Sequence, residues 1–235
     1  LSLLKDKEQI IAKSDPVTRR NQSCYSISGI CHDGKIDMAH LLAGSEGTLA
    51  IFTKITMRTV PLPKAKALLQ LEFESFAKMA QAVPAIVNTG VTTCELMDNF
   101  LYDMAYEALP EYRDILPVGS EAVLLIEHVG DNIEEVKEKI KITDSAAGDL
   151  PKKRKIIIDD SAQKRLWKSR KDAGPLLYRK RSKKHPAEFM EDISVDHNKL
   201  GEYIAGLQDI GRRYNFKMSF YGHAGDGELH VRPFL

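Results

Sequence analysis

The stretch Lys217-Met-Ser-Phe-Tyr-Gly-His-Ala-Gly-Asp-Gly-Glu-Leu-His-Val-Arg-Pro-Phe-Leu235 contains two runs typical of β-strands, separated by glycines. The runs cover 217–223 and 228–234, and the Gly-Asp pair between them is a recognised signal for a two-residue hairpin turn. The stretch therefore predicts an antiparallel hairpin. In the register that such a turn implies, Tyr221 pairs with His230 and His223 pairs with Glu228.

Alternation along this hairpin separates a polar face from an apolar face, because successive side chains of a strand point to opposite sides of the sheet. The polar face is predicted to carry Ser219, Tyr221, His223, Glu228, His230 and Arg232. The apolar face is predicted to carry Met218, Phe220, Leu229 and Val231. One face of the hairpin can then join the core while the other carries reactive groups.

The two histidines of the polar face are candidate metal ligands. In the predicted register His223 and His230 are diagonal neighbours, with Cα atoms about 7–8 Å apart. Two imidazoles at that spacing can converge on one divalent ion, and a carboxylate normally completes the ligand set. Histidines beside a turn also serve as ordinary hydrogen-bonding residues, and composition alone leaves both interpretations open.

Upstream of the hairpin, strand-like and helix-like segments alternate. The predicted strands are 67–73, 92–97, 122–129, 155–160 and 188–195. Two predicted helices are placed by their caps: one follows Ser75 as its N-cap, and one starts at Asp131, with Glu134 completing a capping box. Three further helices are predicted over 99–109, 161–175 and 198–214. This order predicts an α+β fold, with helices packed on an antiparallel sheet in a ferredoxin-like domain.

A further strand is predicted over 48–60, where apolar residues alternate with polar ones. Pro61 and Pro63 follow it, and prolines at the end of a strand are typical of a boundary. We therefore predict two domains, 1–63 and 64–235.

Bulk composition excludes several classes of protein. The 235 residues carry a formal net charge of +1, which gives no global field to attract nucleic acid. The apolar runs are too short to cross a bilayer. The three cysteines, Cys24, Cys31 and Cys94, form no CxxC pair, so we expect no iron–sulfur cluster within this chain. Such thiols are typical of a reducing compartment, which predicts a cytoplasmic protein that could also associate peripherally with a membrane.

Two segments, far apart in the chain, resemble one family in the order that family requires. Gly44-Ser-Glu-Gly-Thr48, with the strand and prolines after it, resembles the end of a vanillyl-alcohol-oxidase-type FAD-binding domain. Gly222-His-Ala-Gly-Asp-Gly-Glu-Leu-His230 resembles the Gly-His-x-Gly-Asp-Gly-Asn-Leu-His motif of the FAD-linked 2-hydroxyacid dehydrogenases. That family includes D-lactate dehydrogenase, the glycolate oxidase flavin subunit and D-2-hydroxyglutarate dehydrogenase. Glu95-Leu-Met-Asp98 and Trp167-Lys-Ser-Arg170 also resemble it.

The resemblance implies a role for each candidate residue. Five residues are expected to contact FAD: Gly44, Ser45, Glu46, Gly47 and Thr48. Arg170 is expected to bind the substrate carboxylate, and Arg232 is a second candidate because it lies on the histidine face of the hairpin. His223 and His230 are expected to hold a divalent metal, zinc or manganese. Glu191 and Asp192 are expected either to support the arginine or the metal, or to be structural.

The chain also departs from the family pattern. Glu228 replaces the usual asparagine, and Ala50 replaces a glycine. In several members of the family a third metal ligand, a glutamate, comes from a later segment. The usual catalytic base of the family also lies there, so we assign no catalytic base. The sequence begins without methionine and stops within its densest polar cluster, and we expect it to be a fragment. On this interpretation, 1–63 is the C-terminal part of an FAD-binding domain and 64–235 is a truncated substrate domain.

The resemblance implies that the intact protein oxidises a 2-hydroxy acid of the D-lactate, glycolate or D-2-hydroxyglutarate type by hydride transfer to FAD. We expect the isolated fragment to be inactive. Electrons would pass to another subunit, a quinone or an iron–sulfur domain outside this chain, and the protein could be a homo-oligomer. Two alternatives are a non-catalytic cap or partner-docking domain and, less favoured, a metal-dependent hydrolase.

Overall fold

The computed structural model describes residues 4, 6–15, 18–20, 25–32, 34–179 and 185–235. Internal contacts divide the chain into two compact units, Leu1–Pro61 and Leu62–Leu235. In the second unit the strands are β3 (Ala65–Phe73), β4 (Thr93–Asp98), β5 (Ala122–Gly130), β6 (Lys153–Ile157), β7 (Met190–Ser194), β8 (Met218–His223) and β9 (Glu228–Pro233). Its α-helices are α4 (Phe76–Val87), α5 (Asn99–Ala108), α6 (Ile133–Ala146), α7 (Asp160–Ala173), α8 (Leu176–Arg179) and α9 (Leu200–Arg213). Short 3₁₀ turns are η1 (Pro110–Tyr112), η2 (His197–Lys199) and η3 (Ala224–Asp226).

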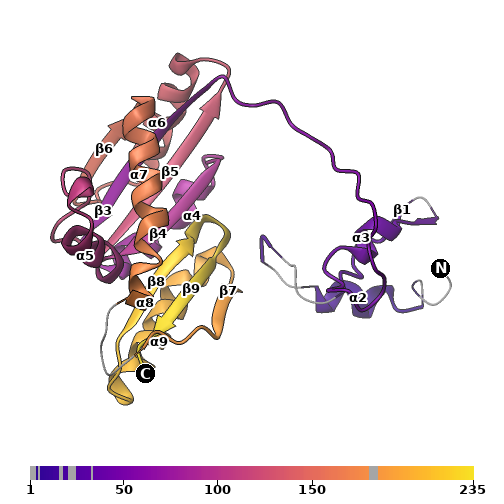
Figure 1. Ribbon diagram of the computed structural model, residues 1–235. Helices are drawn as coiled ribbons and strands as arrows, with labels where there is room; N and C mark the ends of the chain where they lie inside the picture. Colours follow the sequence, from indigo (N-terminus) through magenta and orange to yellow (C-terminus); the bar gives the residue numbers. More distant parts are fainter. Residues whose placement is uncertain (1–3, 5, 16–17, 21–24, 33, 180–184) are drawn as a thin grey trace. The chain divides into compact units, whose positions relative to one another are not determined.

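The seven strands form one sheet in the order β6-β3-β5-β4-β8-β9-β7 (Figure 1). Every pair of neighbouring strands in it is antiparallel. The α+β prediction, with helices on an antiparallel sheet, is therefore confirmed.

Helices cover both faces of this sheet and define two apolar clusters. On one face, α4, α6 and α9 pack against residues such as Leu69, Leu124 and Phe220. On the other face, α5, α7 and α8 pack against residues such as Leu68 and Leu125. Figure 1 shows α7 crossing this second face. Because neighbouring residues of β3 and β5 join different clusters, the strands are apolar on both sides, as expected for a sheet buried between two layers.

Side-chain caps mark where α4 and α6 begin. The Ser75 hydroxyl accepts a hydrogen bond from the backbone N–H of Lys78, as predicted for α4. The predicted start of α6 at Asp131 was wrong by one residue. Asn132 is the cap, accepting from the N–H of Glu135, and the Glu135 carboxylate accepts in return from the N–H of Asp131. Both Asp131 and Asn132 are suitable capping residues, so only the reciprocal contact of Glu135 distinguishes them.

The register of the terminal hairpin is confirmed, with Tyr221 opposite His230 and His223 opposite Glu228. The predicted two-residue turn was wrong. The ladder ends at His223 and Glu228, and η3 followed by Gly227 makes a longer connection. Gly227 has a φ of 72°, in the left-handed region that favours glycine.

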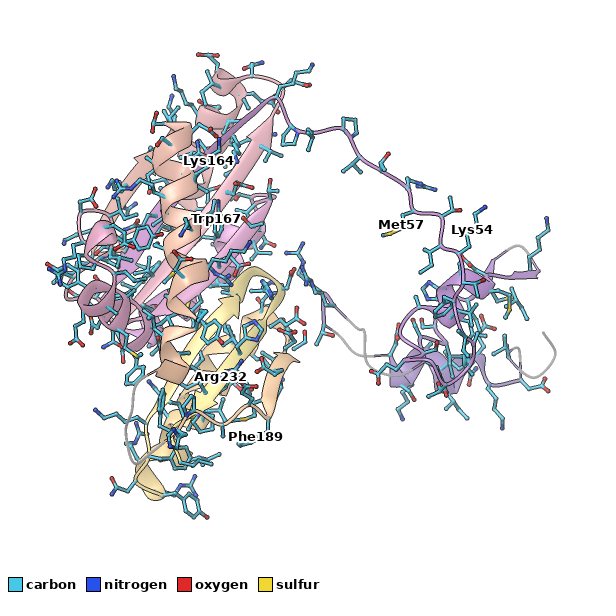
Figure 2. The ribbon with its side chains drawn as sticks, in the orientation of Figure 1. Lys54, Met57, Lys164, Trp167, Phe189 and Arg232 are labelled. Carbon is cyan, nitrogen blue, oxygen red and sulfur yellow. The ribbon has the colours of Figure 1, made fainter. Side chains whose placement is uncertain are left out.

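The first unit contains α2 (Glu8–Ser14), β1 (Cys31–His32), β2 (Lys35–Ile36) and α3 (Met38–Leu42). The strand predicted over 48–60 is absent from the described structure, and its apolar side chains are exposed, with Ile51 at 90% and Met57 at 80%. Figure 2 labels Lys54 and Met57 on this segment. Alternation indicates which side chains would share a face, but a strand also needs a hydrogen-bonding partner, and no described segment pairs with this one.

Two further predictions from the sequence concern membrane-spanning segments and the state of the cysteines. Among the helices of the described residues, none has the length and apolarity to cross a membrane. Cys31 is an exposed free thiol and Cys94 a buried one, while Cys24 lies outside the described residues.

Candidate functional site

The polar face of the hairpin lies on the side of the sheet that α7 covers. In the antiparallel pairing of β4 with β8, Leu96 is opposite Gly222, so one further step along the same register sets Glu95 opposite His223. Arg170 comes from α7, one helical turn after Trp167 and Leu166. Figure 2 shows Trp167 on this helix and Arg232 on β9, the strand that also carries His230. Hereafter the polar site means Glu95, Arg170, Glu191, Asp192, Tyr221, His223, His230 and Arg232.

Glu95 contacts two of the predicted site residues. One of its oxygens, Oε1, lies 2.6 Å from Nδ1 of His223, and the other, Oε2, accepts a hydrogen bond from Nη2 of Arg170. Burial opposes ionisation of this carboxyl group, but the hydrogen bond with His223 and the charge of Arg170 outweigh it and lower the pKa of Glu95. Glu95 is therefore a carboxylate at neutral pH.

Glu191 makes the equivalent pair of contacts on the other side of the site. Its Oε2 lies 2.7 Å from Nδ1 of His230, and its Oε1 pairs with Nη2 of Arg232. Asp192 approaches the same ring nitrogen, with Oδ1 3.3 Å from Nδ1 of His230. The register of β7 against β9 shifts between Met190 and Ile193, and Asp192 has a φ of 49°. This irregularity allows two consecutive acids to reach one histidine.

The rings of the polar site pack closely in tilted and edge-on arrangements. The ring centroids of Tyr221 and His230 are 4.9 Å apart, and those of His223 and His230 are 5.8 Å apart. The Arg232 guanidinium lies 5.6 Å from the Tyr221 ring centroid, within reach of a cation–π contact. Burial raises the pKa of Tyr221, so this phenol stays protonated at neutral pH.

Three residues of the site have a geometry compatible with a metal ion. Asp192, His223 and His230 each offer one ligand atom, and these atoms lie within 4.8 Å of one another. Two imidazole nitrogens and one carboxylate oxygen match the ligand types that zinc and manganese accept. Glutamates beside both histidines match the carboxylate–histidine pairs that commonly surround protein metal sites.

The predicted flavin-contact segment forms a tight turn in the first unit. Gly44, Glu46 and Gly47 all have positive φ, and the backbone N–H of Thr48 donates to the Ser45 carbonyl at 2.9 Å. A Cβ added at Gly47 would meet no atom within 4 Å. The Ser45 hydroxyl oxygen is buried and has no hydrogen-bond partner among the described residues. An open surface beside a glycine turn and an orphaned hydroxyl are compatible with a bound cofactor that approaches the backbone closely.

Sequence reasoning brought together Arg170, Arg232 and both histidines, but it missed the role of Glu95 and gave Asp192 only a supporting one. Glu95 is the acid in the middle of an otherwise largely apolar strand. A buried carboxylate needs a charged or hydrogen-bonding partner, so an acid at this position could have been recognised from the sequence as a candidate site residue. The contribution of Asp192 was not detectable, because the irregularity in β7 that directs it toward His230 leaves no trace in the alternation pattern.

A family model and several individual proteins resemble this chain, and they point to one family. The model for the FAD linked oxidases, C-terminal domain, matches residues 62–235. Glycolate oxidase subunit GlcD of Bacillus subtilis is 29% identical over 95% of this chain and 45% of its own length. D-2-hydroxyglutarate dehydrogenase of Pantoea ananatis is 23% identical over all of this chain and 24% of its own length. The chain thus spans less than half of these relatives.

A solved structure supports the fold alone. Alkyldihydroxyacetonephosphate synthase matches with a TM-score of 0.56 and 14% identity, over 86% of this chain and 41% of that one. At this identity the match concerns the arrangement of strands and helices, and it says nothing about ligands.

Proposed function

This chain belongs to the family of FAD-linked oxidase C-terminal domains, and we propose that it forms the substrate-binding part of a flavoprotein that oxidises a small 2-hydroxy acid. The observation that carries the proposal is the polar site, where two arginines and two histidines meet on one sheet face. The relatives named for glycolate and D-2-hydroxyglutarate support an acid of this class, and D-lactate is the third candidate.

Arg170 is the proposed anchor for the substrate carboxylate, with Arg232 as the second. The Nε of Arg170 is buried and donates to no acceptor among the described residues. A buried guanidinium N–H left without an acceptor is costly, and a substrate carboxylate would supply one. Tyr221, packed beside Arg232, helps to hold the shape of the site.

Asp192, His223 and His230 are the proposed holders of a divalent ion, zinc or manganese. An ion there would polarise the hydroxyl of the substrate and lower its pKa. Asp192 supplies a carboxylate from within this chain, whereas the resemblance alone placed the third ligand in a later segment. We assign no described residue as the base that takes the hydroxyl proton.

Residues 1–63 are proposed to belong to the FAD-binding domain, with the turn from Gly44 through Ser45, Glu46 and Gly47 to Thr48 facing the cofactor. Bound FAD would accept the hydride from the substrate carbon. The turn contributes backbone groups, space beside Gly47, and the Ser45 hydroxyl. The iron–sulfur cluster, the electron acceptor, the homo-oligomer and the cytoplasmic location remain predictions about the whole protein.

The test uses the full-length protein, with glycolate, D-lactate and D-2-hydroxyglutarate as substrates and an artificial dye as electron acceptor. Arg170→Lys is expected to raise KM for the accepted acid by about tenfold or more, because lysine cannot replace a bidentate guanidinium contact. Arg165→Lys is the matched control, since Arg165 lies on the same helix but pairs with Asp114 at the surface. Its KM is expected to be unchanged.

Two results would overturn the proposal. A full-length protein that neither contains nor takes up flavin would favour the non-catalytic cap or partner-docking domain. Equal KM values for wild type and Arg170→Lys would remove Arg170 from the substrate site.

A further inference from the structure

Each arginine–histidine pair of the polar site is bridged by one glutamate that uses its two oxygens for different partners. Glu95 contacts His223 with Oε1 and Arg170 with Oε2. We propose that Glu95 is a positioning residue that fixes the His223 ring and the Arg170 guanidinium relative to each other. This inference rests on the function proposed above, in which His223 binds a metal ion and Arg170 binds the substrate carboxylate.

Backbone pairing makes Glu95 a rigid bridge. β4 and β8 are hydrogen-bonded neighbours, and extending their register by one step from the Leu96–Gly222 pair sets Glu95 opposite His223. Side chains directly opposite in an antiparallel pair have Cβ atoms about 4.5–5.5 Å apart, so the contact needs no loop movement. Glu95 therefore holds His223 from the neighbouring strand and Arg170 from the helix above the sheet.

Burial distinguishes Glu95 from Glu191. The Glu95 side chain is 11% exposed, whereas Glu191 is 42% exposed and lies beside the irregular part of β7. Solvent screens an exposed ion pair, and water replaces its contacts when one partner is removed. When one partner of a buried ion pair is removed, the remaining charge is left without a compensating group. The positioning role is accordingly assigned to Glu95.

Contact at Nδ1 determines which nitrogen of His223 can meet a ligand. A carboxylate beside Nδ1 favours the proton on that nitrogen, and the lone pair of the neutral ring then lies on Nε2. Histidines that bind metals commonly have such a partner on the other nitrogen, which fixes both tautomer and ring orientation. Glu95 would thus prepare Nε2 as the ligand atom.

The same carboxylate balances the charge of Arg170. A guanidinium near a metal site would be repelled by a divalent cation, and the negative charge of Glu95 between the two offsets that repulsion. With one oxygen for each neighbour, Glu95 couples the carboxylate-binding group to the metal-binding group. In a glutamine an NH₂ group, which cannot accept a hydrogen bond, replaces one of these two oxygens, so one of the two partners loses its acceptor.

The first measurement observes the ring nitrogens of His223 by NMR in the full 235-residue chain, with histidine labelled by ¹⁵N. The signal is assigned by its loss in His223→Asn. At about pH 8, Nδ1 of His223 is expected to carry a proton in the wild type. Arg170→Gln is expected to shift this signal, whereas Arg165→Gln leaves it unchanged. An unprotonated Nδ1 in the wild type, or no response to Arg170→Gln, would refute the coupling.

The second measurement is a calorimetric titration of the same chain with Zn²⁺. Glu95→Gln is expected to weaken zinc binding about 10–100-fold, and Glu95→Asp, which keeps the charge, to recover part of it. Glu127→Gln is the matched control, because Glu127 is a half-buried acid that contacts Trp167 of the same helix at 3.3 Å. Zinc binding to Glu127→Gln is expected to equal that of the wild type.

The two measurements separate the inference from the proposed function. A wild type that binds no zinc while Nδ1 carries its proton would remove the metal from the proposed function and leave the positioning role intact. Zinc binding that is as strong in Glu95→Gln as in the wild type would remove the positioning role.

Discussion

At the scale of single residues, Asp98 is a buried acid that lies outside the polar site. Its side chain is buried and accepts hydrogen bonds from the backbone N–H groups of Leu101 and Phe220 and from the Ser219 hydroxyl. It therefore caps α5 and ties that helix to β8. Burial raises the pKa of Asp98 to about 7, although the three hydrogen bonds act in the opposite direction.

This shift predicts a pH-dependent stability. The folded pKa of Asp98 exceeds that of an unfolded aspartate, about 3.9. The stability it contributes is therefore complete below about pH 4 and is lost as the pH rises through about 7. The free energy of unfolding, measured in urea, is expected to fall by roughly 2–4 kcal/mol more in the wild type than in Asp98→Asn over this range.

An exposed aspartate provides the control for that experiment. Asp149→Asn removes a carboxyl group from the surface and is expected to keep the pH profile of the wild type. Parallel profiles for wild type and Asp98→Asn would show that burial does not shift this group.

Residue types and strand parity were enough to predict the groups of the hairpin, because His223, His230 and Arg232 lie close together in sequence. They were not enough for Glu95. Its partner His223 is 128 residues away, and its contact depends on which strands become neighbours. Alternation within one strand carries no information about that choice.

At the scale of elements, the turn between β8 and β9 depends on one glycine. Gly227 has a positive φ, and an added Cβ would collide with the Val195 carbonyl oxygen. Gly227→Ala is expected to lower the free energy of unfolding by about 2 kcal/mol or more, through strain and this collision. Urea denaturation followed by circular dichroism measures the change.

Gly206→Ala is the matched substitution within a helix. Gly206 is an exposed position of α9, and a Cβ there would meet no atom within 4 Å. This variant is expected to be about 0.5–1 kcal/mol more stable than the wild type, because alanine favours the helix. Equal destabilisation by both substitutions would contradict the explanation for Gly227.

Helices and strands of the second unit were predictable where periodicity coincided with a local cap or turn, as for Ser75 before α4. The segment 48–60 shows why periodicity alone was insufficient. It alternates regularly, but no described segment pairs with it, whereas β3 has β5 and β6 beside it. Pairing, and not pattern, decided which of the two became a strand.

At the scale of the whole molecule, the sheet and its helices lie entirely within the second unit. A protein reduced to residues 62–235 is therefore expected to keep the unfolding temperature of the full chain in calorimetry. It is also expected to scatter less light at equal concentration, because it lacks the exposed Ile51, Ile55 and Met57.

A midpoint several degrees lower than that of the full chain would show that the first unit stabilises the second. Substitution of Ile51 and Met57 by serine in the full chain separates the two effects. It should reduce scattering and leave the midpoint unchanged.

The pairing of β4 with β8 has a consequence for the order in which the molecule folds. Contacts between β3 and β5, or within the β8–β9 hairpin, close comparatively short loops, whereas the contact of Glu95 with His223 closes one of 128 residues. Long-range pairings carry a larger entropic cost and form slowly. We expect the layers around β3 and β5 to consolidate first and the hairpin to dock on β4 late. The chain would then acquire its ligand-binding chemistry only at the final stage of folding.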